Sequence, residues 1–168
     1  MKKSIALFGT SADPPTIGHK KILEELSKIY TFTIGYVSNN PKKKHIEDIS
    51  IRSHLLKTLI DGLDNPKILF NQKISSQWAV DSIKKCKEIY KFNNLDFVIG
   101  SDLIKDIFYW KNFDKIILEV SFFIILREGY PVESNTLKML ETYKVKFKIS
   151  TIKTPNIYFA RGFNYCSC

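Results

Sequence analysis

The sequence has few cysteines, no long apolar run and no low-complexity tract, and each absence narrows the class of protein. Its three cysteines, Cys86, Cys166 and Cys168, lack the spacing of zinc ligands and predict reduced thiols in a reducing compartment. The apolar stretch at 5–8 is too short for a signal peptide. No run approaches the roughly 20 apolar residues of a membrane span. We therefore expect a cytoplasmic protein without a membrane partner.

Acidic residues are also scarce relative to basic ones. Lysine and arginine number 26 against 17 aspartates and glutamates, for a formal net charge of +9. This excess favours an anionic partner such as nucleic acid, a membrane surface or a small phosphorylated molecule. Nucleic acid is the weakest of these, because it is supported only by the charge and by the "PKKKH" run, with no RNP, KH or helix-turn-helix pattern.

Hydrophobic residues make up 44% of the 168 residues, enough for one core in one domain. Short apolar runs predict strands at 4–10, 31–37, 67–70, 96–102, 121–128 and 145–151. Helical spacing of apolar residues predicts helices at 16–30, 51–63, 77–90, 113–120 and 135–143. The first helix would bury Ile22, Leu23, Leu26, Ile29 and Tyr30, and the third Ala79, Ile83, Cys86 and Tyr90.

This alternation predicts an α/β fold with an open, Rossmann-like parallel sheet and helices on both faces. In such sheets, ligands bind at the carboxyl ends of the strands. Four segments would meet there: "GTSADPPTIGH" after the first strand, "SNNPKKKH" after the second, "GSD" after the fourth and "REGYP" after the fifth.

The segment after the first strand has the composition of a phosphate-binding loop. Gly9 and Thr10 would turn backbone N–H groups toward an anion, and a helix beginning near Thr16 would add its positive end. His19, in the first turn, could donate a hydrogen bond to a phosphate oxygen. The segment is neither a P-loop nor a G-x-G-x-x-G fingerprint. A tight turn with a half-exposed histidine is the alternative that this pattern leaves open.

The order of residues in the segment resembles the ATP-binding signature of the nucleotidyltransferase superfamily. That signature contains a glycine loop, an Asp-Pro pair and a (His/Thr)-x-Gly-His element. Here they are Gly9, Asp13-Pro14 and "TIGH" at 16–19, with Thr16 in place of the more common first histidine. The resemblance implies the nucleotidyltransferase form of the α/β fold.

Further motifs resemble the nicotinate-nucleotide adenylyltransferase family over roughly residues 4–131. They are "VSNNPKKKH", the arginine-led "IRSHLLKTLI", "FVIGSDLIKDIFYWKNFDKI" and "LREGYP". The resemblance implies a transferase that joins nicotinate mononucleotide to the adenylyl group of ATP, releasing pyrophosphate, in NAD biosynthesis. No carboxylate–histidine set in the sequence has the spacing of metal ligands, so the metal we expect is Mg²⁺ carried by ATP and coordinated by phosphates and water. The oligomeric state stays open, a homo-oligomer included.

By the same resemblance, His19 would be the catalytic residue, binding the α-phosphate of ATP and stabilising transition-state charge. The ATP-binding residues would be Phe8, Gly9, Thr10, Thr16, Gly18, His19, Gly100, Asp102 and Arg127. Asp102 would contact adenosine; a helix N-cap is its alternative role. Lys42, Lys43 and Lys44 could attract the triphosphate, and a solvated loop is the alternative for them.

The pyridine-nucleotide residues implied by the resemblance are Asp13, Asn40, Lys43, Trp78 and Trp110. Trp110 would stack on the nicotinate ring, since an indole face suits an electron-poor pyridinium; a core tryptophan is the alternative. At 72–82 this chain reads "QKISSQWAVDS" where the family usually has an arginine and Ser-Tyr-Thr. The preference for acid or amide mononucleotide therefore stays open. His45 and His54 are expected to be structural.

The late Ser-Ser/Thr-x-x-Arg element of the superfamily is missing. After "KTPNI" the chain reads "YFARGFNYCSC", so we expect a domain at 1–157 and an atypical tail at 158–168, replaced or truncated, as a shifted reading frame would produce. The activity would then be reduced. The alternatives are an adenylyltransferase for pantetheine phosphate or another small phosphate, and a nucleotide-binding module with impaired catalysis.

Overall fold

In the computed structural model of the chain, residues 3–154 are described. Their strands form one sheet in the order β3-β2-β1-β4-β5-β6, and all neighbours pair in parallel. The strands are β1 (Ser4–Thr10), β2 (Phe32–Val37), β3 (Ile68–Phe70), β4 (Asn94–Gly100), β5 (Ser121–Arg127) and β6 (Phe147–Thr154). The predicted α/β fold is confirmed.

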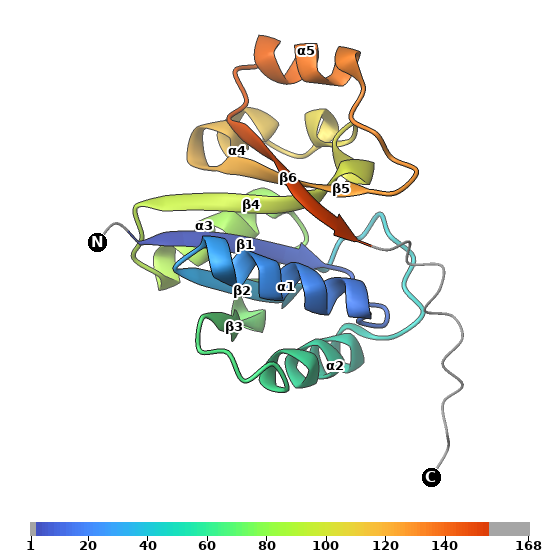
Figure 1. Cartoon of the computed structure of the whole chain (residues 1–168), viewed down its shortest axis with the longest axis vertical. Coiled ribbons are helices and arrows are strands. Elements are labelled where there is room, and N and C mark those ends of the chain that lie inside the picture. Colours follow the sequence, from blue (N-terminus) through green and yellow to red (C-terminus); the bar gives the residue numbers. More distant parts are fainter. Residues whose placement is uncertain (1–2, 155–168) are drawn as a thin grey trace.

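Helices cover both faces of this sheet (Figure 1). They are α1 (Ile17–Ile29), α2 (Ile49–Asp61), α3 (Ala79–Ile89), α4 (Phe113–Glu119) and α5 (Ser134–Thr142), with short 3₁₀ turns η1 (Gln72–Ile74), η2 (Ser101–Leu103) and η3 (Ile107–Tyr109). Side chains of α1 and α2 share one apolar cluster with one face of the strands. Side chains of α3, α4 and α5 share a second cluster with the other face. The sheet is thus buried on both sides, as its continuously apolar strands require.

The predicted elements are present with shifted ends. The helix predicted at 51–63 begins two residues earlier at Ile49, and the last strand runs to Thr154 rather than 151. Ser101 and Asp102 belong to η2 instead of β4. The three 3₁₀ turns were not predicted, because three residues are too few for a periodic pattern.

The prediction that Ile29 is buried in the core is wrong. Ile29 is 56% exposed, whereas Leu23, Leu26 and Tyr30 are buried. At 3.6 residues per turn, Ile29 lies roughly 100° around the helix from the middle of that buried face. On α3, Ile83 and Cys86 are buried as predicted, with Ala79 and Tyr90 packed beside them.

The topology brings four loops to one edge of the sheet. Because the strands are parallel, β1, β2, β4 and β5 all end there, so the four predicted segments lie on the same side. No helix among residues 3–154 is long and apolar enough to cross a membrane. Cys86 is a free, buried thiol. Cys166, Cys168 and the predicted tail at 158–168 lie outside the described residues.

Candidate active site

Strand β1 ends with a glycine, Gly9, followed by Thr10, and this glycine has no room for a side chain. A Cβ at Gly9 would lie 2.5 Å from the hydroxyl oxygen of Tyr36, its partner in the β1–β2 register. Tyr36 is only 2% exposed and cannot move aside. Gly9 therefore leaves the space that the Tyr36 ring occupies across the end of β1.

His19 is held on both ring nitrogens. Its Nδ1 lies 3.0 Å from the backbone N of Thr16 and 2.8 Å from the Thr16 hydroxyl. A backbone N–H can only donate, so Nδ1 accepts and the proton of the neutral ring is on Nε2. That Nε2–H donates to Thr10 Oγ1 at 2.8 Å. Gly18 leaves space beside Thr16, where a Cβ would be 3.4 Å from its hydroxyl.

The environment keeps His19 neutral. Burial, and secondarily the positive charge of Arg127, lowers the pKa of His19 to about 4. The Phe8 ring supplies part of that burial, with its centroid 6.2 Å from the imidazole. At neutral pH the ring thus offers one N–H donor of known direction without a positive charge.

The turn after β4 is joined to the end of β5. Arg127 pairs with Asp102 at 2.7 Å, and the Ser101 hydroxyl accepts from Arg127 N–H at 2.9 Å and donates to the Tyr130 carbonyl at 2.7 Å. A Cβ at Gly100 would lie 2.2 Å from Asp102 Oδ1. Asp102 makes no N-cap, since Gly100 occupies the cap position of η2. Its Oδ1 is buried without a hydrogen-bond partner among the described residues.

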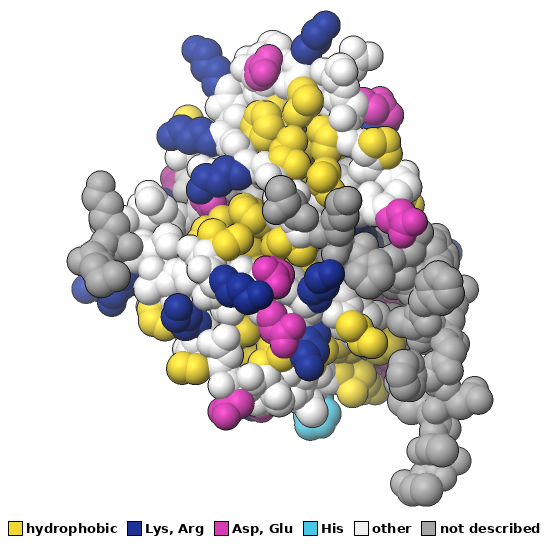
Figure 2. Space-filling model, in the orientation of Figure 1, with side chains coloured by type: hydrophobic (Ala, Val, Ile, Leu, Met, Phe, Trp, Pro, Cys, Tyr) yellow, Lys and Arg dark blue, Asp and Glu magenta, His cyan; other side chains and the backbone are white. Residues whose placement is uncertain are grey.

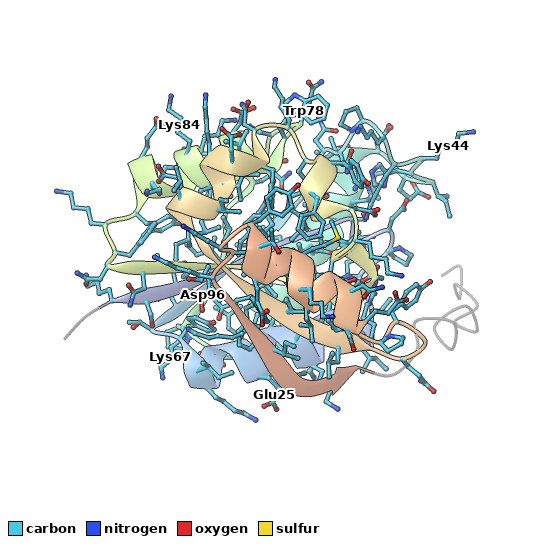
Figure 3. All side chains as sticks on the ribbon, turned by 90° about the horizontal axis from the view of Figure 1, so that it is seen from above. Glu25, Lys44, Lys67, Trp78, Lys84 and Asp96 are labelled. Carbon is cyan, nitrogen blue, oxygen red and sulfur yellow. The ribbon has the colours of Figure 1, made fainter. Side chains whose placement is uncertain are left out.

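The loop after β2 presents its lysines to solvent. Asn40 starts the run, because its side chain accepts from Lys42 N–H at 2.9 Å and its carbonyl from Lys43 N–H at 3.2 Å. Lys42 and Lys43 are exposed, as is Lys44, and none pairs with a carboxylate within residues 3–154. In Figure 3, Lys44 lies at the right-hand edge of the molecule, well apart from Asp96, which is near the amino end of β4.

Asp13 contacts the far end of this basic loop. Its carboxylate accepts from Ile46 N–H at 2.6 Å and from Glu47 N–H at 3.2 Å. His45 packs beside it, with Nδ1 3.6 Å from the Asp13 carboxylate. His54 is exposed on α2, apart from this contact. Both oxygens of Asp13 are thus engaged by protein groups.

The two tryptophans differ in what they contact. Trp78 is the N-cap residue of α3, and the Nζ of Lys111 lies 5.2 Å from its ring centroid. Trp110, the neighbour of Lys111, is half-buried and meets Phe97 edge-to-face at 6.0 Å and Phe122 at 6.3 Å. Trp110 therefore packs on the core, while the 110–111 segment reaches across to Trp78.

Comparison with known proteins agrees with this arrangement. The cytidylyltransferase-like family pattern matches residues 7–157. A "probable nicotinate-nucleotide adenylyltransferase" of Buchnera aphidicola is 31% identical over 147 residues, which cover 82% of this chain and 68% of the relative. The chain belongs to the nicotinate-nucleotide adenylyltransferase branch of this family. The resemblance of its motifs is thereby confirmed.

Two further comparisons extend the match. The Synechocystis "probable nicotinate-nucleotide adenylyltransferase" is 28% identical over 146 residues, covering 81% of this chain and 73% of the relative. The structure of Plasmodium falciparum nicotinic acid mononucleotide adenylyltransferase complexed with NaAD superposes with a TM-score of 0.73 at 25% identity. That superposition covers 96% of this chain and 80% of the Plasmodium chain.

Sequence reasoning missed two charged residues of this edge. Arg52 is 2% exposed although it is a cation. A signal was present, since Arg52, Leu56 and Ile60 are spaced by four residues and all three are buried on one face of α2. Lys111 follows the predicted Trp110 directly, but its approach to Trp78 depends on how α3 packs.

Proposed function

We propose that this protein transfers the adenylyl group of ATP to nicotinate mononucleotide, giving the dinucleotide and pyrophosphate, as a step in NAD biosynthesis. The observation that carries the proposal is His19: a neutral imidazole with its Nε2–H directed into the loop after β1, at the start of α1. Relatives named for this activity support the choice of substrate pair.

The reaction needs positioning and charge stabilisation more than a protein nucleophile. The acceptor phosphate attacks the α-phosphorus in line, forming one P–O bond while the bond to the β-phosphate oxygen breaks and pyrophosphate leaves. In this account His19 shifts its Nε2–H bond from Thr10 to an α-phosphate oxygen and stabilises the charge that develops there. The backbone of Gly9 and Thr10 and the start of α1 add N–H donors.

The remaining ATP contacts come from two other loops. Lys42, Lys43 and Lys44 attract the β- and γ-phosphates, since their ammonium groups are exposed and unpaired with any described carboxylate. Asp102 accepts from adenosine through Oδ1, the oxygen without a partner in the described chain, while Arg127 fixes its other oxygen.

The pyridine ring binds near Trp110 and Trp78, with Asn40 and Lys43 on the neighbouring loop. Lys111 favours the acid over the amide mononucleotide, because its ammonium lies against Trp78 with no described carboxylate paired to it. A nicotinate carboxylate would complete that charge pair, and an amide would not.

The metal in this account is Mg²⁺ brought by ATP. We propose that phosphates and water supply its ligands, as is usual for Mg²⁺ bound with a nucleotide. When bound with ATP, Mg²⁺ would neutralise part of the phosphate charge. The buried, free Cys86 thiol is consistent with the cytoplasmic location that we propose.

The face of the molecule shown in Figure 2 does not resemble a nucleic-acid interface in its described residues. On the face shown in Figure 2, lysine and arginine side chains are interspersed with acidic and hydrophobic ones and form no continuous stripe across its described residues. Nucleic-acid binding usually needs such a stripe or patch.

An acceptor panel tests the proposal. Pyrophosphate release and the dinucleotide product are measured with ATP and, in turn, nicotinate mononucleotide, nicotinamide mononucleotide and phosphopantetheine. We expect the highest kcat/KM with nicotinate mononucleotide. Turnover of phosphopantetheine alone would contradict the proposal, and ATP binding with no turnover of any acceptor would indicate a nucleotide-binding module.

A further inference from the structure

The exposed lysine loop between β2 and α2 is bonded at its start to the last residue of β1 and at its end to the loop after β1. At its start, Ser38 N–H donates to the Thr10 carbonyl at 2.8 Å. At its end, the Asp13 carboxylate accepts the N–H groups of Ile46 and Glu47, as described above. The lysine run at 42–44 thus lies in the middle of a short arc whose two ends are bonded to β1 and to the loop that follows it.

Arg52 joins the same two loops from beneath. Its Nε donates to the Glu47 carbonyl at 3.0 Å and its Nη1 to the Ser11 carbonyl at 2.7 Å. No carboxylate of the described residues lies within 4.0 Å of it. Burying the Arg52 guanidinium carries a desolvation cost that an apolar side chain on this face of α2 would avoid. Stability alone therefore does not explain why an arginine is buried here.

We propose that Asp13 and Arg52 are positioning residues that clamp the lysine loop over the phosphate-binding loop. The proposal rests on the proposed function in one respect: it takes the anion that binds between the two loops to be the polyphosphate of ATP. Neither residue needs to touch that anion, since their polar atoms are already bonded to backbone groups of the loops.

The expected benefit is preorganisation. A free arc must lose loop and side-chain freedom when it binds a polyphosphate, and a clamped arc has already lost much of it. Releasing the clamp should therefore weaken polyphosphate binding about 5- to 30-fold, the factor that corresponds to roughly one or two kcal/mol. This loss of affinity should occur only when Lys42, Lys43 and Lys44 are present, because the clamp acts by positioning these lysines.

A double-mutant cycle tests this dependence with inorganic tripolyphosphate as the probe. Asp13→Asn keeps the shape of the side chain but places an amide N–H against a backbone N–H. It is made in the natural chain and in a chain carrying Lys42→Met, Lys43→Met and Lys44→Met, and the dissociation constants are measured by calorimetry. We expect a loss of about 5- to 30-fold in the natural chain and less than about twofold in the lysine-free chain.

Controls separate the clamp from general damage. Asp61→Asn, at the exposed end of α2, should leave the affinity unchanged, and thermal unfolding checks that each variant is folded. Arg52→Lys, which keeps the charge but loses the fork between two carbonyls, is the second test variant if Asp13→Asn does not fold. In turnover with ATP, either variant should raise KM for ATP more than it lowers kcat.

The outcomes are distinct from those of the acceptor panel. Equal losses in both backgrounds, no loss in the natural chain, or no tripolyphosphate binding by the natural chain would each overturn the clamp. Lysine-dependent coupling without dinucleotide synthesis would support the clamp while removing the proposed reaction.

Discussion

Two carboxylates at opposite edges of the sheet, the buried Asp96 and the partly exposed Asp102, show how a binding edge differs from a structural one. Asp96, at the amino edge, accepts from the Tyr30 hydroxyl at 2.5 Å and from Lys148 Nζ at 2.9 Å. Burial and this bond raise the pKa of Tyr30, so it remains a donor. Asp102, at the carboxyl edge, has one oxygen paired with Arg127 and one buried without a described partner.

The two carboxylates differ in whether an oxygen is left for a ligand; an unpartnered buried atom does not by itself mark the binding edge, because Thr33 Oγ1, in the same register row as Asp96, also lacks a partner among the described residues. A buried polar atom without a partner costs free energy, and Asp102 carries that cost at the edge where His19 offers its N–H. Asp96 does not carry this cost, although the two carboxylates are close in the sequence: Asp96 lies in β4, and Asp102 lies in η2, which begins directly after Gly100 at the end of β4. We therefore expect substitutions at the carboxyl edge to change kinetics, and those at the amino edge to change stability.

The largest expected effect is at His19. His19→Ala should lower kcat about 10²–10³-fold, because it removes the donor proposed to stabilise transition-state charge. The measurement is steady-state turnover, with thermal unfolding as the check on folding. His54→Ala, on the exposed side of α2, is the matched control and should keep full turnover. Unchanged kcat in His19→Ala would remove this residue from the mechanism.

The two aspartates provide a direct test of the comparison. Asp102→Asn should lower kcat/KM for ATP about 10- to 100-fold, by weakening a charged hydrogen bond to adenosine. Asp96→Asn should instead lower the free energy of unfolding by about 1–3 kcal/mol and leave kcat/KM of the folded protein unchanged. Kinetics and denaturant unfolding are measured on both variants. Interchanged effects would refute the distinction between the edges.

The sequence predicts those features of the two edges that depend on neighbouring residues, and it does not predict contacts between residues far apart in the chain. The strands follow from local apolar runs, and the parallel order puts "GTSADPP", "GSD" and Arg127 at one edge. The partner of each polar atom does not follow, because Asp96 meets Tyr30 and Lys148 only through long-range packing. The sequence shows Gly9 only as part of a glycine-containing turn. Its contact with Tyr36 cannot be read from the sequence, because it depends on the β1–β2 register.

The pH dependence of stability should report the neutral state of His19. Its pKa is about 4 in the folded protein against 6.5 for an ordinary histidine. The unfolded chain therefore takes up a proton first, and stability is lost as pH falls from about 6.5 to about 4, by at most about 3 kcal/mol. The free energy of unfolding is measured with denaturant between pH 7.5 and 4 for the natural chain and for His19→Gln. It should fall less steeply with decreasing pH in the variant. Parallel slopes would contradict a depressed pKa.

The smallest expected effect is at the pyridine end. Lys111→Met should lower the ratio of kcat/KM for nicotinate over nicotinamide mononucleotide about two- to fivefold, since exposed charge pairs contribute little. Lys115→Met, on α4, is the control. A ratio that stays constant in Lys111→Met would exclude this ammonium from acid recognition.

The most direct test of the central claim follows the phosphorus atoms of ATP. The protein is incubated with nicotinate mononucleotide and ATP labelled either at the α- or at the γ-phosphorus, and the products are separated. Our account predicts the α label in the dinucleotide and the γ label in pyrophosphate, in equal amounts. Release of the γ label as inorganic phosphate, or an α label that never enters a dinucleotide, would contradict it.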